Sequence, residues 1–171
     1  MSAIKSIQAI QVIDSRGTPT VSCKVVLENG ISATSMVPSG ASTGSREALE
    51  LRDGGLPFMG KGVKHALTNI QEIIAPAIVG MDVINQQKID EKMIMLDGTP
   101  TKSKLGANAI LSVSLAVLEL GSKLLGMPLY KYINQVFKEI NGENLIMQMP
   151  TPMLNIINGG EHADNNVDIQ E

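Results

Sequence analysis

Apolar and polar residues alternate along the first forty positions of the chain. Within residues 20–28 one face collects the apolar side chains of Val21, Cys23, Val25 and Leu27. This period of two is typical of a half-buried strand, and residues 4–13 and 31–37 alternate in the same way. Asn29-Gly30 predicts a type I′ hairpin turn, which needs positive φ at both positions. The pattern therefore predicts a three-stranded antiparallel meander.

Helical spacing replaces the alternation after Pro38. A short helix is expected over residues 45–52, with Ser45 as its N-cap, and a longer one from Lys61, ended or kinked at Pro76. Two more helices are expected over residues 89–96 and 107–125; the second is apolar nearly all round and should be buried. A final helix follows Pro128 and is expected to bury Leu129, Tyr132, Ile133, Val136 and Phe137.

This order of elements, strands first and helices afterwards, predicts an α+β fold. A polar break at residues 141–144, followed by Pro150 and Pro152, places a domain boundary near residue 141. Residues 153–157 and 167–170 then predict two short strands. Because about thirty residues cannot form a domain without staples, we expect 1–141 to be one domain and 142–171 the truncated start of a second.

Composition narrows the classes of protein. The 171 residues are 43% hydrophobic and 18% charged, which argues against a disordered chain. Aromatic residues make up only 2% and the net charge is -3, so we expect no nucleic-acid partner. The single cysteine, Cys23, suits a reducing cytoplasm. The longest uncharged apolar stretch, 105–118, is shorter than the ~20 residues of a membrane span, so none is expected.

One candidate site is the loop from Pro38 to Gly44, built from small residues between a strand and a helix. Its glycines allow close approach to a ligand, and its serine hydroxyls and main-chain groups can meet a metal ion or a phosphate. It lacks the Gly-Lys-Ser/Thr ending of a Walker loop. The alternative is a solvated connection.

A second group of candidates lies near the C-terminal end. His162, in a polar loop after an expected strand, suits a general acid or a phosphate ligand, or is a surface histidine. Asp168, Gln170 and Glu171 close another expected strand, where carboxylates bind metals or move protons in barrel enzymes; the alternative is a solvated strand end. Asn155 supports the site or caps a neighbour. The other histidine, His65, is expected on a helix as a surface or packing residue.

These segments together resemble the enolases, the phosphopyruvate hydratases of glycolysis. The resemblance spans the whole chain and is closest to the bacterial form. It is carried by residues 14–17, 38–44, 47–53, 60–63, 97–99, 102–103, 106–110, 155–164 and 170–171. The sequence departs from the family at Thr18 and at residues 54–57, neither of which is expected to touch the chemistry. The family chain is more than twice as long, with an α+β domain followed by a (β/α)8-type barrel.

The resemblance implies a lyase reaction. Enolases dehydrate 2-phosphoglycerate to phosphoenolpyruvate with two Mg²⁺ ions, a lysine base and an acidic residue. By resemblance Ser42 ligates the second Mg²⁺, His162 and Gln170 contact the substrate, and Glu171 belongs to the acid pair around the leaving hydroxyl. His162 and Glu171 are thus the catalytic candidates. The base, the main acid and the carboxylates of the first metal lie outside these residues, so this chain alone is expected to be inactive.

The resemblance also implies a homodimer, with the Arg16 turn near the subunit contact, in the cytoplasm, although family members also occur at the bacterial cell surface and are secreted. Two alternatives remain open at this point. One is a non-catalytic module that binds a partner through its sheet or helices, which has no need of Ser42 or Glu171. The other is a related acid-sugar dehydratase or racemase, against which the serine-rich loop and residues 159–162 argue.

Overall fold

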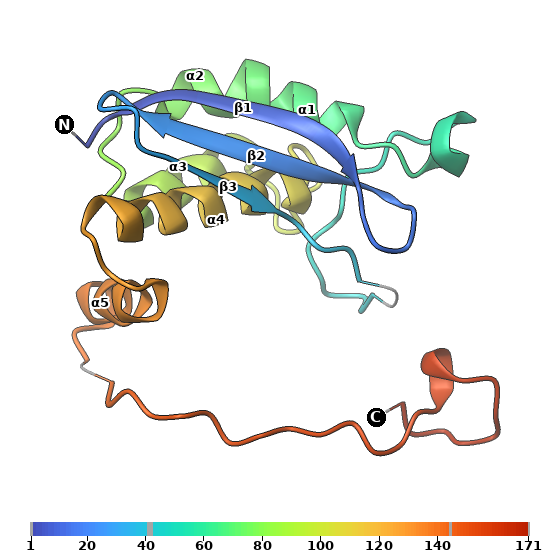
Figure 1. The fold of residues 1–171 in the computed structure, drawn as a ribbon. Helices are drawn as coiled ribbons and strands as arrows, with labels where there is room; N and C mark the ends of the chain where they lie inside the picture. Colours follow the sequence, from blue (N-terminus) through green and yellow to red (C-terminus); the bar gives the residue numbers. More distant parts are fainter. Residues whose placement is uncertain (1, 41–42, 144, 171) are drawn as a thin grey trace.

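Three antiparallel strands form the first layer of the fold. The computed structural model describes residues 2–40, 43–143 and 145–170. Strands β1 (Ile4–Ile13), β2 (Pro19–Leu27) and β3 (Ser32–Met36) lie in the order β1-β2-β3, as the alternation predicts. Helices cover one face of this sheet (Figure 1), so the expected α+β class is confirmed.

The turn between β2 and β3 differs from the expected type. Gly30 has a φ of +85°, but Asn29 keeps a negative φ. Gly30 N donates to Leu27 O, and Leu27 N donates to Ile31 O, which leaves three residues in the loop. This is the three-residue connection with glycine in the left-handed position, which matches strand twist as well as the two-residue turn does. The type I′ prediction was therefore wrong, while the hairpin itself was right.

The helices follow the sheet in chain order. They comprise the turn η1 (Pro57–Gly60), α1 (Lys64–Asn69), the π-helical turn η2 (Ile70–Ile74), α2 (Ala75–Ile78), α3 (Gln86–Asp97), α4 (Ala107–Leu124) and α5 (Leu129–Asn141). From α1 to α2 the chain is one continuous helix, and its π-helical turn ends at Ile74, two residues before Pro76. A proline cannot donate the usual backbone bond, and such turns accommodate the defect. Gly98 ends α3 in the left-handed conformation, with φ +69°.

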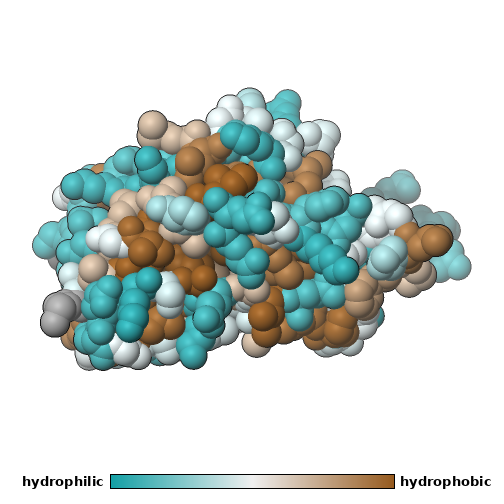
Figure 2. Space-filling model, turned by 90° about the horizontal axis from the view of Figure 1, so that it is seen from above, coloured by the Kyte–Doolittle hydropathy of each residue, from teal (hydrophilic) through white to brown (hydrophobic). Residues whose placement is uncertain are grey.

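The core lies between the sheet and α4. One face of α4 packs against β2 and β3, while α1, η2 and α2 pack against β1. Cys23 is completely buried there, and this burial raises the pKa of its thiol to about 12, although a hydrogen bond with Ser112 opposes the shift. Among the described residues α4 is the one helix long and apolar enough to cross a membrane, and half of it is buried, as in a core helix. The face seen from above in Figure 2 mixes hydrophilic and hydrophobic residues.

Residues 45–52 do not form the expected helix. They run as a turn followed by extended chain, which we call the strap, residues 49–52. Leu49 N donates to Thr101 O at 2.7 Å, and Leu49 O accepts from Ala107 N at 2.8 Å. The strap therefore satisfies its backbone groups with the segment that leads into α4. Because these partners replace the bonds of a helical turn, the local preference for helix is overridden.

The chain after α4 is much less buried than its apolar pattern suggests. Of the five α5 residues expected in the core, only Tyr132 is buried; Leu129 and Ile133 are 40% and 45% exposed. The expected strands at 153–157 and 167–170 are not formed in the described part of the chain, where Met153 is 95% exposed. A strand needs a neighbour to pair with, and residues 145–158 run extended without one (Figure 1).

We predict that Gly121→Ala destabilises the domain by about 1–3 kcal/mol. An added Cβ on Gly121 would lie 2.6 Å from Tyr132 Cζ, so the only buried side chain of α5 would be displaced. Denaturant unfolding measures the loss. Tyr132→Phe is the matched control: it removes a hydroxyl that has no hydrogen-bond partner among the described residues, so stability should hold or rise. Wild-type stability in Gly121→Ala would contradict the packing argument.

Candidate functional site

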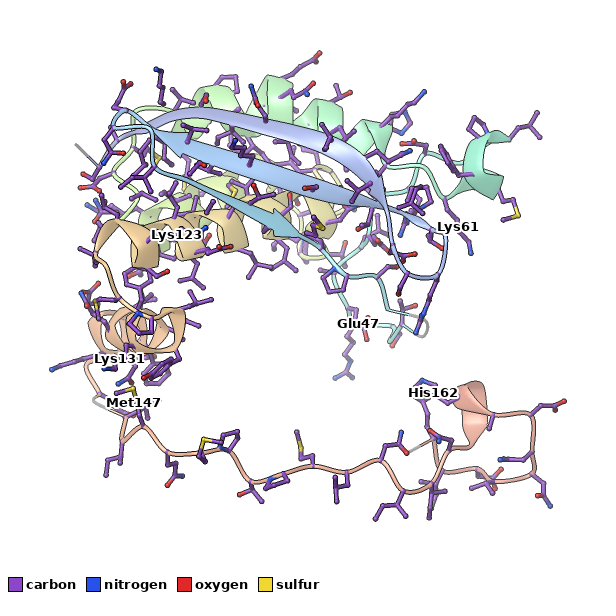
Figure 3. All side chains as sticks on the ribbon, in the orientation of Figure 1. Glu47, Lys61, Lys123, Lys131, Met147 and His162 are labelled. Carbon is purple, nitrogen blue, oxygen red and sulfur yellow. The ribbon has the colours of Figure 1, made fainter. Side chains whose placement is uncertain are left out.

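A polar cavity of about 530 Å³ lies beside the loop of residues 38–44. It is lined by Asp14, Arg16, Thr18, Ser39, Gly40, Glu50, Arg52 and Lys61. These residues come from the β1–β2 turn, the start of the loop, the strap and the segment before α1. Figure 3 shows Lys61 and Glu47 on this side of the domain. Three cations and two carboxylates give the cavity a small positive balance, which suits an anion rather than a cation.

Arg52 is the best-connected side chain of this cavity. Its Nη1 donates to the carbonyl oxygens of Pro19, at 2.5 Å, and Lys61, at 2.6 Å. Its Nη2 donates to Glu50 Oε1 at 2.6 Å and to Ser39 Oγ at 3.2 Å. One guanidinium thus joins four segments of the chain. The planar fork of arginine is suited to this use, because its donors diverge in fixed directions.

Asp14 shapes the β1–β2 turn on the same side. Its Oδ1 accepts from Thr18 N at 2.8 Å and from Arg16 N at 2.9 Å. The bond from Thr18 has the largest effect and lowers the pKa of Asp14. Burial opposes it, but the bond from Arg16 and the charges of Arg16 and Arg52 also act downward, so the pKa lies below its usual value. Asp14 is therefore ionised in the folded protein at neutral pH.

The second candidate region brings together two of the expected site residues. His162 lies in the 3-10 turn η3 (Gly160–His162), and its Nε2 is 3.2 Å from Gln170 Nε2 (Figure 3). Two backbone bonds hold the turn to the end of the chain: Gly159 N donates to Gln170 O, and Gly160 N donates to Val167 O. A Cβ added to Gly159 would lie 2.9 Å from Val167 Cβ, so a larger residue would collide with the end of the chain there. We call His162 and Gln170 the polar pair.

The other residues that the sequence marked as candidates do not join either candidate region in the described part of the chain. Asn155 Nδ2 donates to Asn158 Oδ1 at 2.9 Å, so Asn155 supports the approach to η3 rather than facing a ligand. Asp168 is exposed. His65 is exposed at the start of α1, where its Nδ1 lies 3.6 Å from Asp53 Oδ1, as a surface residue should. Ser42 and Glu171 lie outside the described residues.

A magnesium centre is not assembled by the described part of the chain. No three His, Cys, Asp or Glu side chains come together there as a metal would require. The two carboxylates of the cavity are already engaged, Asp14 with backbone N–H groups and Glu50 with Arg52 and Ser39. Hard divalent cations need several free oxygen ligands. The described residues therefore do not by themselves fit a bound Mg²⁺ ion.

Sequence reasoning missed the residues that build the cavity. Glu50 and Arg52 stand in an expected helix, two positions apart, where they would point to different sides. In the extended strap the same spacing places both side chains on one face. The available signal was a pair of opposite charges, Glu50 and Arg52, six and eight positions after the end of a loop of small residues.

The chain matches two family models. Residues 4–133 match the N-terminal domain of enolase, and residues 146–171 match the C-terminal TIM barrel domain of enolase. It is 57% identical, over 168 residues, to an enolase of Mycoplasmoides gallisepticum and 59% identical, over 169 residues, to an enolase of Malacoplasma penetrans. Each alignment covers 98% of this chain and 35% or 37% of the relative, so the chain spans about a third of the length of these curated relatives.

We predict that Asp14→Ala lowers the melting temperature at pH 7 and that the difference fades as the pH falls below about 4. The folded-state pKa of Asp14 is lowered, so its contribution is present above the unfolded-state pKa and is lost as the pH falls through the folded value. Thermal unfolding of both proteins from pH 2.5 to 7 measures this. Glu28→Ala removes an exposed carboxylate as a control. A difference independent of pH would contradict an electrostatic role.

Proposed function

This chain belongs to the enolase family, and we propose that the protein to which its residues contribute dehydrates 2-phosphoglycerate to phosphoenolpyruvate. The observation that supports this most is the polar pair: the two residues that the family resemblance places on the substrate, His162 and Gln170, lie 3.2 Å apart. They fall within the match to the enolase barrel domain. The reaction is that of a glycolytic lyase.

In this proposal the polar pair binds and orients the substrate. An imidazole and an amide supply both a hydrogen-bond donor and an acceptor, and histidine can carry a proton at neutral pH. The backbone bonds of Gly159 and Gly160 fix both side chains to one short unit. Glu171 follows Gln170 directly and is proposed to act in the acid pair around the leaving hydroxyl.

We further propose that Ser42 contributes a ligand to Mg²⁺ in the complete site. A serine oxygen is a hard donor, and Ser42 follows in sequence two residues after Gly40, which lines the cavity. Mg²⁺ would supply charge stabilisation for the carboxylate of the reacting substrate. The remaining ligands, the lysine base and the main acid would be supplied by residues outside these 171, so the chain alone should not turn over substrate.

The same family membership supports three broader proposals. We propose a homodimer of the complete protein, with the Arg16 turn near the contact, and a cytoplasmic location, as for a glycolytic enzyme. We also propose that residues 1–141 form one domain and that residues 142–171 begin another. The separate matches of 4–133 and 146–171 support that division.

We predict that the purified 171-residue chain gives no phosphoenolpyruvate from 2-phosphoglycerate in excess Mg²⁺, because proton abstraction beside a carboxylate needs a placed base and strong charge stabilisation. A chain of the length of the relatives should be active, and its Ser42→Ala variant should need more Mg²⁺. Absorbance of the product measures all three. Turnover by the short chain, free of host enolase, would overturn the proposal that it lacks essential groups; inactivity of the long chain would overturn the proposed reaction.

We predict that His162→Ala in the longer protein lowers turnover by about 10²-fold or more while the melting temperature changes little. The imidazole is exposed and lies in a loop, so its loss should affect substrate rather than packing. His65→Ala is the matched control, because it removes the other histidine from an exposed helix start. A collapse of stability with normal turnover in the remaining folded enzyme would show that His162 is structural.

A further inference from the structure

The stem of the 38–44 loop is tied to the strap by side chains. Ser39 Oγ donates to Glu50 Oε2 at 2.9 Å, and the other carboxylate oxygen, Oε1, accepts from Arg52 Nη2 at 2.6 Å. Arg52 Nη2 also donates to Ser39 Oγ, at 3.2 Å. The three side chains therefore form a closed triangle of hydrogen bonds, which we call the stem triangle.

The strap residue between Glu50 and Arg52 is bonded to the core. Leu51 N donates to Asn108 Oδ1 at 3.1 Å, and Asn108 Nδ2 donates to Leu51 O at 3.0 Å. Asn108 is 2% exposed and lies in the first turn of α4. Asn108 thus holds both backbone polar groups of Leu51, the residue between Glu50 and Arg52. The exposed residues 43–48 have no such tie to the core in the described part of the chain; their bonds are local, from Gly44 N to Glu47 Oε1 and from Glu47 N to Gly44 O.

We propose that Arg52 is a positioning residue for the 38–44 loop. Arg52 lines the cavity, but its Nη1 and Nη2 donors are taken up by Pro19, Lys61, Glu50 and Ser39, so its bonds go to the protein itself. It holds the Glu50 carboxylate in place, Glu50 holds the Ser39 hydroxyl, and Ser39 begins the loop three residues before Ser42. The loop therefore starts from a fixed point at Ser39.

The charge of the pair suits this role better than a stabilising one. The Arg52 and Glu50 side chains are 20% and 30% exposed, so water partly screens the pair and reduces its contribution to the free energy of unfolding. Its geometry is nevertheless specific, since a carboxylate that bridges a guanidinium and a hydroxyl fixes directions as well as distances. Lysine at position 52 would keep the charge but could not serve four acceptors in the plane of a fork.

Limited trypsin digestion tests the proposal on the 171-residue chain itself. Arg46 is exposed two residues beyond the loop, in the segment 43–48, and its cleavage reports how freely that segment opens. We expect Ser39→Ala and Arg52→Lys each to accelerate cleavage after Arg46 at least five-fold with no matching fall in melting temperature. Ser39→Thr, which keeps the hydroxyl, should restore slow cleavage. The double variant should add little to Arg52→Lys, because both act through one triangle.

Ser32→Ala is the matched control, since it removes a serine hydroxyl from β3 that has no hydrogen-bond partner in the described part of the chain. Wild-type cleavage in both Ser39→Ala and Arg52→Lys would overturn the proposal, as would equal acceleration in Ser32→Ala. If Arg52→Lys fails to fold, Ser39→Ala with its threonine rescue still decides the question.

A link to catalysis rests on the proposed function and is measured separately. In a protein of the length of the relatives, Ser39→Ala should lower kcat more than it raises KM, because it displaces the loop without touching the substrate. A rise in KM with an unchanged kcat would overturn the link. If the long protein without any substitution is inactive, the proposed reaction is rejected. The digestion result then decides the role of the stem triangle by itself.

Discussion

The burial of one face of α4 against the sheet is the constraint on which the other parts of the structure depend. That face is made of small and branched apolar residues, Ala109, Val113, Ala116, Val117 and Leu120, all completely buried. Their small size brings the helix close enough for Ser35 Oγ to donate to the backbone carbonyl of Ser112. Close packing of this kind leaves little freedom to slide or rotate. The N-terminal end of α4 is therefore a fixed point in the molecule.

Hydrogen bonds connect the N-terminal end of α4 to charged residues near the surface. Asn108 binds both backbone groups of Leu51, and the strap that contains Leu51 carries Glu50 and Arg52. Arg52 then reaches Pro19 at the start of β2 and Lys61 before α1. Along this path Asn108 is buried, Leu51 and Arg52 are half-buried, and Lys61 is exposed. A polar cavity with exposed walls consequently takes its shape from the hydrophobic core.

This dependence explains how much of the fold and the site could be predicted from the sequence. In the strands, α3 and α4, apolar residues recur with the period of the element, because the residues on one face must be buried. These elements were therefore predicted from the sequence. The helix at residues 45–52 was wrongly predicted because Ala48 and Leu49 favour a helix locally, whereas the bonds to Thr101 and Ala107 come from residues about fifty positions away. His162 and Gln170 were identified by their residue types, their places at expected strand ends and the family resemblance. Their 3.2 Å separation depends on backbone bonds that no period reveals. Arg52 was missed for the same reason.

The two candidate regions differ in what holds them. The stem triangle is connected to the core through Asn108, but the polar pair is held only by local bonds among residues 159–170. Between the two lies a chain whose apolar side chains are exposed, including Ile156 at 85%. Burying such a side chain is worth about 1.5–3 kcal/mol, so covering several of them would supply enough free energy to order this segment. A fixed geometry between the stem triangle and the polar pair therefore requires that apolar surface to be covered, and hydrogen bonds of the kind that hold η3 are too local to provide it.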